Sequence, residues 1–453
     1  HDILAGSSIR RVHEEAEAAY DGAVHTAGDV ARQAAATIVD DSEALTVLNS
    51  LSWERSTLVG LPEGFTGVMD GAGVSLPVQA IAGQQMAEVT VPSCGWTTLY
   101  PGPIAEPDVS LRAELHLLEN ERLRVVFNEK GEITSILDRE SDRELASGVC
   151  NSLKMYRDVP SQYDAWDIDS MYDLTPVALD EPASIEVVAE GPLLAAIRVA
   201  RKLHRSTMIQ EVRLRRDSRR IDFHTVIDWQ ERHKLLKVHF PVSVHASEAI
   251  HEIQFGHIRR PTHASRPFDA DRFEVSAHKW TALAEEDRGC AVLNDCKYGV
   301  NVLGKSINLT LLKSALAPDM TADRGRQEFT YAFYAWNGSL AESDVVREAY
   351  AINCPVMVVP GAGGERSLLS VDRPNVVIES IKPAEDGSGD LIVRLYESKR
   401  TATRCVLATS LPIVSAAQTN MLEETEADLD LAGDRISLEF RPFEVKTLRL
   451  RMT

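Results

Sequence analysis

The feature that most constrains the fold is a long succession of alternating apolar and polar residues with no helical segment in between. A period of two places the apolar side chains of a strand on one face. Strands that follow one another without crossover helices pair antiparallel and bury those faces by packing sheet on sheet. Residues 110–357 are therefore predicted to form one large antiparallel β-sandwich. The clearest alternating segments are Ser184–Ala189, Leu194–Leu203, Ile209–Arg215, Arg220–Trp229 and Leu236–Val244.

Two Pro- and Gly-rich segments, Tyr100–Pro107 and Pro360–Arg366, separate this region from smaller β regions on either side. A small β domain is predicted over residues 44–105 and a C-terminal β domain over residues 366–453. Within the large region, Asn128–Gly131 predicts a hairpin turn in which Gly131 takes a left-handed conformation. Other expected strands are Leu45–Leu48, Ser56–Leu61, Leu123–Phe127, Glu132–Leu137, Asn375–Ile381, Leu391–Glu397, Arg404–Ala408, Ile436–Phe440 and Glu444–Leu450.

Residues 9 to about 39 carry the contrasting helical pattern, with apolar side chains at steps of three or four. Ser7 or Ser8 can cap its N-terminus. A lone amphipathic helix needs partners, so the segment 1–43 is predicted to be the last helix of a bundle whose other members precede residue 1. The predicted fold class is mainly β: one N-terminal helix, a small β domain, a large antiparallel sandwich and a small C-terminal β-sandwich.

Length and charge narrow the range of functions. A chain of 453 residues suggests about three domains, and a formal charge of −20 repels phosphate backbones, which argues against nucleic-acid binding. No stretch approaches the ~18 consecutive apolar residues of a membrane span. The six cysteines form no CxxC pair and indicate a reducing, cytoplasmic location. Because residue 1 is His and no signal peptide follows, we expect a cut or processed start.

Four polar segments are candidates for chemistry, and each has a simpler interpretation. His1-Asp2 can ligate Zn²⁺ or orient a sugar, or can be an ordinary helix-cap region. Tyr163–Asp169 combines aromatic rings and carboxylates, which suits carbohydrate recognition, or is a solvated loop with one buried Trp. Phe255–His263 is a basic patch for an acidic interface, or a loop anchored by salt bridges. Asp319–Arg326 is predicted to be a charged surface loop.

In their order along the chain, these segments resemble the α-mannosidases of glycoside hydrolase family 38, with a closer likeness to the bacterial and cytosolic branch. The first residues are similar to the family's HDILPGSSI segment, with Ala5 in place of Pro. Further resemblance covers nearly the whole chain. It lies in Asn49–Arg55 (NxLSWxR), Tyr163–Asp169 (YDAWDID), Arg260–His263 (RPTH), Asp271–Val275 (RFEV), Asn294–Gly299 (NDCKYG) and the block from Pro318 to Tyr331.

The resemblance implies a C-terminal portion of a retaining, zinc-dependent exo-α-mannosidase that hydrolyses terminal α-D-mannose from oligosaccharides. It also implies that the large sandwich is galactose-mutarotase-like. His1 would be one ligand of Zn²⁺. The other ligands, the nucleophile and the acid/base would belong to an N-terminal catalytic domain absent from this chain, which would be inactive alone and would not hold zinc alone. Implied partners are a mannose-containing oligosaccharide and that missing domain; a homo-oligomer is also allowed, without nucleic acid or membrane.

By position, five side chains are predicted to contact the sugar. Asp2 follows the zinc-ligating His1 and would contact the sugar or support the metal. Trp166, Asp167, Asp169 and Lys313 would line one wall of the cleft. Two alternatives remain: a non-catalytic carbohydrate-binding or structural β module, and an epimerase or phosphorylase that shares the large sandwich. The ordered family segments argue against the last of these.

Overall fold

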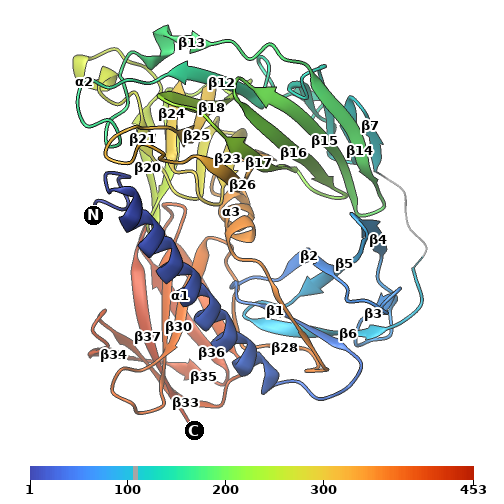
Figure 1. The fold of residues 1–453 in the computed structure, drawn as a ribbon. Helices are drawn as coiled ribbons and strands as arrows, with labels where there is room; N and C mark the ends of the chain where they lie inside the picture. Colours follow the sequence, from blue (N-terminus) through green and yellow to red (C-terminus); the bar gives the residue numbers. More distant parts are fainter. Residues whose placement is uncertain (106–110) are drawn as a thin grey trace. The chain divides into compact units, whose positions relative to one another are not determined.

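The computed structural model describes residues 1–105 and 111–453 (Figure 1). The expected start of the sandwich at residue 110 and the end of the Tyr100–Pro107 linker lie outside the described residues. The chain divides into two compact units. The first contains His1–Gln33, the described part of Asp108–Glu252, and Arg259–Ser339. The second contains Ala34–Pro107 as far as it is described, Ile253–Ile258 and Leu340–Thr453.

The described residues form few helices: α1 (Arg10–Ala36), α2 (Pro267–Ala270), α3 (Val345–Asn353) and a 3-10 turn, η1 (Tyr172–Leu174). Helix α1 confirms the helical pattern of the N-terminal segment, but among its residues only Ala35 is buried. Tyr20 and Val24 on this helix are 60% and 73% exposed. The expected bundle partners of α1 therefore stay a prediction. No described helix has the length and apolar character needed to cross a membrane.

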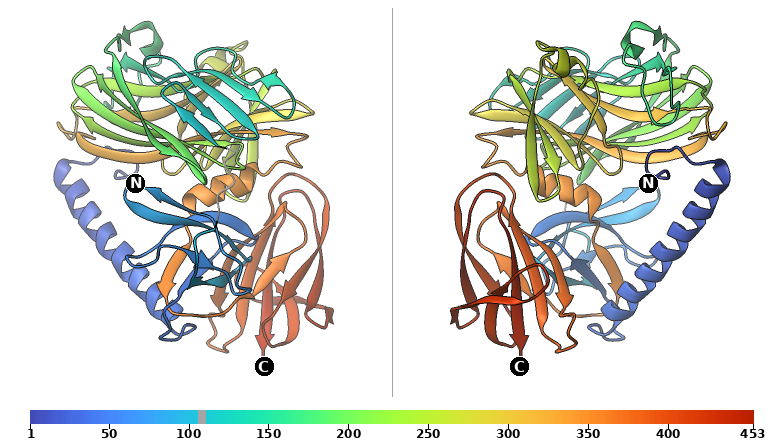
Figure 2. Two further views of the ribbon diagram at one scale, coloured as in Figure 1. Left: turned by 90° about the vertical axis from the view of Figure 1, so that its right-hand side faces the viewer. Right: turned by 90° about the vertical axis from the view of Figure 1, so that its left-hand side faces the viewer.

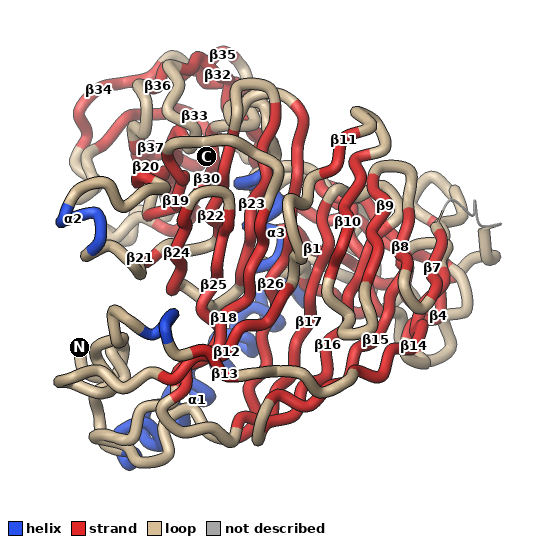
Figure 3. The backbone as a smooth tube through the Cα atoms, turned by 90° about the horizontal axis from the view of Figure 1, so that it is seen from above, coloured by secondary structure: helices blue, strands red, loops and turns tan. Residues whose placement is uncertain are grey.

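The first unit is organised around a nine-stranded sheet, whose strands are drawn as red stretches of the backbone tube in Figure 3. Its alternating burial is clearest in β17, where every second side chain from Ile221 to Trp229 is buried. This confirms the period-two pattern of the sequence. In sheet order the strands are β14 (Ala183–Glu190), β15 (Leu194–Leu203), β16 (Ser206–Arg215), β17 (Arg220–Trp229), β26 (Gly325–Asn337), β23 (Arg288–Asn294), β22 (Trp280–Ala284), β19 (Glu248–Ile253) and β20 (Gly256–Pro261).

Two smaller sheets share one apolar core with this large sheet, which makes the unit a sandwich. One sheet contains β11 (Arg143–Glu144), β10 (Ile133–Asp138), β9 (Leu123–Phe127), β8 (Leu117–Glu119) and β7 (Arg112–Glu114). The other contains β13 (Pro176–Val177), β12 (Ser152–Arg157), β18 (Lys234–Pro241), β25 (Ser306–Lys313), β24 (Gly299–Leu303) and β21 (Val275–Ser276). Gly131 has φ +72° in the β9–β10 turn, as expected.

A ring of hydrogen bonds lies inside this apolar core. The Tyr331 hydroxyl donates to Asn151 Oδ1 at 2.6 Å, and Asn151 Nδ2 donates to Gln210 Oε1 at 2.8 Å. Gln210 Nε2 closes the ring by donating to the Tyr331 oxygen at 2.8 Å, and it also donates to Thr225 at 2.9 Å. All four residues are buried. Because buried polar atoms are costly without partners, the ring fixes how β16, β17 and β26 align with the segment before β12.

The described residues of the second unit form four sheets. β1 (Leu45–Asn49) pairs with β27 (Met357–Pro360), so the chain after residue 340 joins the sheet of the small β region. That sheet also contains β6 (Gly95–Pro101), β28 (Arg366–Ser367) and β3 (Val68–Met69); the neighbouring one contains β2 (Arg55–Gly60), β5 (Gln84–Val91) and β4 (Val78–Ile81).

The C-terminal part of the second unit is a small β-sandwich whose strands are drawn in orange to red in Figure 2. A single apolar core contains side chains from both of its sheets. The first sheet is β29 (Leu369–Val371), β32 (Thr403–Thr409), β36 (Arg435–Phe440) and β35 (Leu431–Ala432). The second is β30 (Val376–Pro383), β31 (Leu391–Glu397), β37 (Val445–Met452), β33 (Ile413–Thr419) and β34 (Thr425–Leu429).

Removing the hydroxyl of Tyr331 tests whether the buried ring stabilises the sandwich. Tyr331→Phe leaves Asn151 Oδ1 without its donor and Gln210 Nε2 without one acceptor, so we expect the free energy of unfolding to fall by about 1–3 kcal/mol. Urea unfolding at neutral pH measures this. Tyr298→Phe, at a tyrosine that is 44% exposed, is the control and should be nearly neutral. Equal stability of the two variants would show that the ring adds nothing.

Candidate functional site

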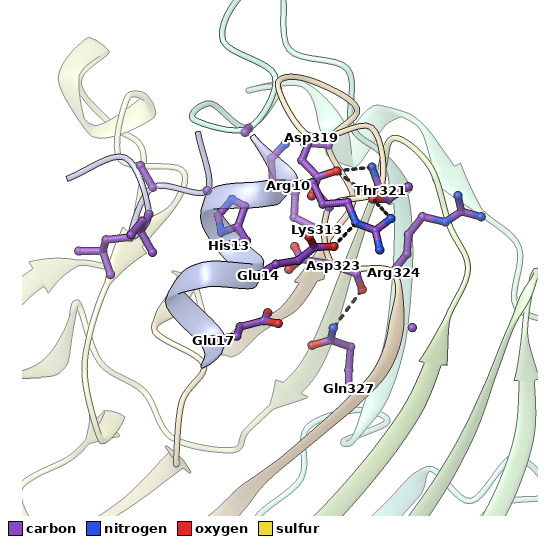
Figure 4. Close-up of a pocket in the computed structure, with 18 of the residues that line it drawn as sticks. Arg10, His13, Glu14, Glu17, Lys313, Asp319, Thr321, Asp323, Arg324 and Gln327 are labelled. Atoms are coloured by element: carbon purple, nitrogen blue, oxygen red, sulfur yellow. Dashed lines mark hydrogen bonds and ion pairs between the residues drawn. The ribbon is translucent and has the colours of Figure 1, made fainter. Parts of the chain in front are cut away.

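A cavity of about 740 Å³ in the first unit brings together segments that are far apart in the sequence (Figure 4). The loop before α1, the first turns of α1, the Tyr163–Asp169 segment, the end of β25 and the loop before β26 all contribute to its wall. Its lining is mostly polar and mixes both signs of charge. The charged and ionisable side chains in the lining are Arg10, His13, Glu14, Glu17, Lys313, Asp319, Asp323 and Arg324.

The N-terminal loop reaches the cavity with the residues that follow His1 and Asp2. The Gly6 N–H donates to the Ile3 carbonyl at 3.0 Å, and the Ser7 N–H donates to the Asp2 carbonyl at 2.9 Å. Gly6 has φ +69°, a conformation that side chains disfavour, and this allows the tight turn before the helix. Residues 3–6 line the cavity. His1 and Asp2 contact each other, with Nε2 and Oδ1 3.2 Å apart and side chains 87% and 53% exposed.

The Tyr163–Asp169 segment is anchored at both ends and exposes its middle. Asp164 Oδ2 accepts hydrogen bonds from His233 Nε2 at 3.0 Å and from the Leu316 N–H at 2.6 Å. The Asp169 N–H donates to Asp158 Oδ1 at 2.8 Å. Trp166 is 58% exposed, so the alternative of a loop with one buried Trp is wrong. Between the anchors, Ala165 lines the cavity, and Trp166 and Asp167 are exposed.

Lys313 lies at the end of β25, where it lines the cavity and forms an ion pair with the buried Asp158. The carboxylate of Asp158 is 1% exposed and the side chain of Lys313 is 17% exposed. A buried carboxylate needs such a partner, so Lys313 also holds the Tyr163–Asp169 segment in place through Asp158. Its ammonium group is therefore fixed rather than free to reorient.

The charged loop from Asp319 to Arg324 lines the cavity, and Gly325 and Gln327 of β26 continue that wall. Asp319 Oδ1 accepts hydrogen bonds from the Thr321 N–H and hydroxyl, and Arg10 of α1 donates to the Thr321 oxygen at 3.4 Å. These bonds appear as dashed lines in Figure 4. Asp323 has φ +58°. Arg324 Nε has no hydrogen-bond partner among the described residues.

Comparison with known proteins identifies the family. The profile "Glycosyl hydrolases family 38 C-terminal domain" matches residues 118–321, and "Glycosyl hydrolases family 38 C-terminal beta sandwich domain" matches residues 375–448. This chain carries the C-terminal domains of glycosyl hydrolase family 38.

Curated relatives of this family 38 chain are named as α-mannosidases. Alpha-mannosidase 2C1 of Homo sapiens is 36% identical over 474 residues, which covers 99% of this chain and 44% of the relative. Alpha-mannosidase G of Dictyostelium discoideum is 34% identical, over 74% of this chain and 32% of the relative. The chain therefore spans less than half the length of these relatives.

A solved structure shows the same fold. The α-mannosidase from Enterococcus faecalis V583 superposes with a TM-score of 0.81 at 17% sequence identity, over 99% of this chain and 61% of that one. This likeness supports the arrangement of the strands described above. It carries no information on individual side chains.

The described residues do not gather a set of metal ligands. Residues 1–105 and 111–453 contain no group of three or more His, Cys, Asp or Glu side chains that could hold a metal ion. His1 and Asp2 together offer two ligand atoms, whereas protein zinc sites use three or four protein ligands.

The predicted site residues differ in how close they lie to the cavity. Lys313 lines the cavity, and Asp2, Trp166 and Asp167 lie in segments that supply other lining residues. Asp169 stabilises the local turn instead, since its Oδ1 accepts a hydrogen bond from the Met171 N–H at 3.0 Å. Sequence reasoning missed three kinds of contribution. These are the buried anchors Asp158, Asp164 and His233, the α1 residues Arg10, His13, Glu14 and Glu17, and the Asp319–Arg324 wall.

The anchor at Asp164 predicts a dependence of stability on pH. Burial raises the pKa of its carboxyl, but the hydrogen bonds from Leu316 and His233 outweigh burial and hold the pKa below the ordinary aspartate value. A carboxyl whose pKa is lower in the folded state stabilises the protein above the unfolded pKa of about 4, and this contribution disappears as the pH falls through the folded pKa.

Asp164→Asn should therefore lower the free energy of unfolding by about 1–3 kcal/mol at pH 7, and the difference from the unmodified chain should shrink towards pH 3. Asp167→Asn, in the same segment and exposed, is the matched control and should change stability little at either pH. Denaturant unfolding at both pH values measures this. A deficit of Asp164→Asn that stays constant from pH 7 to pH 3 contradicts the assignment.

Proposed function

We propose that this chain is part of a retaining, zinc-dependent exo-α-mannosidase and supplies one wall of the site that binds the terminal mannose of an oligosaccharide. The observation that carries the proposal is the convergence of the loop before α1, the Tyr163–Asp169 segment, Lys313 and the Asp319–Gln327 segment around one cavity. Family membership supports the reaction class. The cytoplasmic location inferred from the cysteines is part of the same proposal.

The chemistry of the cavity suits a sugar. A hexose presents hydroxyl groups that both donate and accept hydrogen bonds, and charged side chains make the stronger partners. Arg324 and Lys313 donate, and Asp319 and Asp323 accept. The exposed Trp166 offers an aromatic face to the C–H side of a sugar ring.

The reacting groups are expected outside this chain. A retaining glycosidase uses two carboxyl groups about 5–5.5 Å apart, one as nucleophile and one as acid/base. The family resemblance assigns both to an N-terminal domain, together with most of the zinc ligands. In this proposal His1 is one ligand of that metal, which would bind hydroxyls of the terminal mannose. The side chains of this chain bind and orient the sugar.

A second candidate function is a non-catalytic carbohydrate-binding module, which the exposed Trp166 beside Asp167 favours. Such a module binds sugar without any other domain. Calorimetry of the isolated chain with mannose and manno-oligosaccharides separates the two candidates. Binding at millimolar affinity or better supports the carbohydrate-binding module. Absence of binding supports the mannosidase proposal, in which this chain binds sugar only together with the N-terminal domain.

The proposal predicts that this chain alone does not hydrolyse an aryl α-mannoside, with or without added Zn²⁺, because the nucleophile and acid/base are absent. A longer protein that includes the N-terminal domain should hydrolyse the same substrate. Release of the aryl group measures both. Zinc-dependent turnover by the 453-residue chain would refute the claim that the reacting groups lie outside it. Inactivity of the longer protein would refute the mannosidase assignment.

Within the longer active protein, Arg324→Gln should lower kcat/KM roughly tenfold or more, because a cation that lines the cavity is lost as a hydrogen-bond donor to the substrate. Arg326→Gln is the matched control. Arg326 is two residues away, 68% exposed and paired with Glu328, so the change should leave kcat/KM almost unchanged. Equal effects of the two substitutions would remove Arg324 from the site.

A further inference from the structure

A second cavity of about 240 Å³ lies in the first unit, where two family-like motifs meet. Arg260–His263 comes from the end of β20 and the following loop, and Asp271–Val275 leads into β21. These are edge strands of the nine-stranded and six-stranded sheets. The mannosidase proposal uses neither motif, and no lining residue is shared with the cavity around Lys313. Its lining includes Tyr172, His251, Arg260, Asp269, Arg272 and Asn301.

Arg260 is a half-buried cation without an anionic partner. Its guanidinium donates to the Ser276 carbonyl oxygen at 3.2 Å, and no described carboxylate forms an ion pair with it. Burial lowers the pKa of Arg260, and the charge of Arg272 lowers it further. A charge held in a protein wall beside a like charge is unfavourable until an anion compensates it.

The nearby carboxylates are already engaged or exposed. Asp269 contacts Arg266 at 3.0 Å, Arg272 at 3.5 Å and His263 at 4.0 Å, so two guanidinium groups share one buried carboxylate. Glu274 is paired with the buried Lys237. Asp173 also lines the cavity, but its side chain is exposed. The local balance therefore leaves the charge of Arg260 uncompensated.

The rest of the wall is neutral and preformed. Burial, followed by the charge of Arg260, lowers the pKa of His251 to about 3, so its imidazole is neutral at pH 7. It contacts the Thr281 hydroxyl at 3.3 Å. Asn301 donates to the Tyr172 oxygen at 3.2 Å, and that hydroxyl donates to Glu274 at 3.2 Å. These bonds fix the side chains around the cavity before any ligand arrives.

We propose that this cavity is a binding site for a small oxyanion-bearing molecule, whose carboxylate or phosphate group is held by the guanidinium of Arg260. The planar fork of an arginine matches two oxygens of either group, which makes such pairs both strong and directional. A volume of about 240 Å³ is below the ~300–1,000 Å³ of pockets for drug-sized ligands, so the ligand is of monosaccharide size or smaller.

The experiment is calorimetry on the 453-residue chain with inorganic phosphate, mannose 6-phosphate, glucuronate and uncharged mannose, at low salt. At least one of the three oxyanions is expected to bind, whereas mannose should not bind through Arg260. Binding of the phosphates identifies a phosphate ligand, and binding of glucuronate identifies a carboxylate ligand. Either result supports the proposal, and failure of all three overturns it.

Arg260→Gln should weaken the binding roughly tenfold or more, because the charge and the fork are both lost. Arg259→Gln is the matched control, since Arg259 is the preceding residue, is 43% exposed and lies 3.9 Å from Glu248. Arg260→Lys keeps the charge without the fork and is the substitute if the Gln variant does not fold; its affinity should fall severalfold. Unchanged affinity in the folded Arg260 variants overturns the proposal. None of these readouts depends on mannosidase activity.

Discussion

The apolar face of the nine-stranded sheet must be covered along its whole width, and the two smaller sheets of the first unit share that task. Strands must therefore pass from one layer to the other. The short segment between β17 and β18 and the longer one between β25 and β26 both make this passage. Because Trp229 is paired with Gly325 and Leu235 with Lys313, the two connections lie at the same end of the sandwich.

The candidate sugar site is a consequence of that register. Gln230 lies in the first connection, and Ala315, Asp319, Asp323 and Arg324 lie in the second, and all of them line the large cavity. Loops tied to paired strand ends have little freedom, which is what a binding wall requires. The ion pair between Lys313 and Asp158 adds the Tyr163–Asp169 segment to the same rigid frame.

The sequence predicts most strands of the sandwich because period-two alternation is a local signal. It predicts neither their partners nor α3, whose buried positions Val345, Val346, Ala349 and Tyr350 span barely more than one turn. The sequence does not reveal the roles of individual carboxylates either. Asp164, Asp167 and Asp169 look alike along the chain. Only the approach of His233 and Leu316, which come from distant segments, makes Asp164 an anchor and leaves Asp167 exposed.

The buried cation Lys237 in the first unit is paired with an anion, which gives a standard for judging Arg260. Lys237 is completely buried, and it is matched by Glu274, by the Thr310 hydroxyl at 2.8 Å and by the Tyr172 ring at 5.6 Å. Burial still lowers the pKa of Lys237, so even this well-paired charge is held against desolvation. Arg260 is held beside a cavity with a single carbonyl oxygen and a second guanidinium nearby. Unlike Lys237, Arg260 has no anion beside it among the described residues, and the proposed oxyanion would supply one.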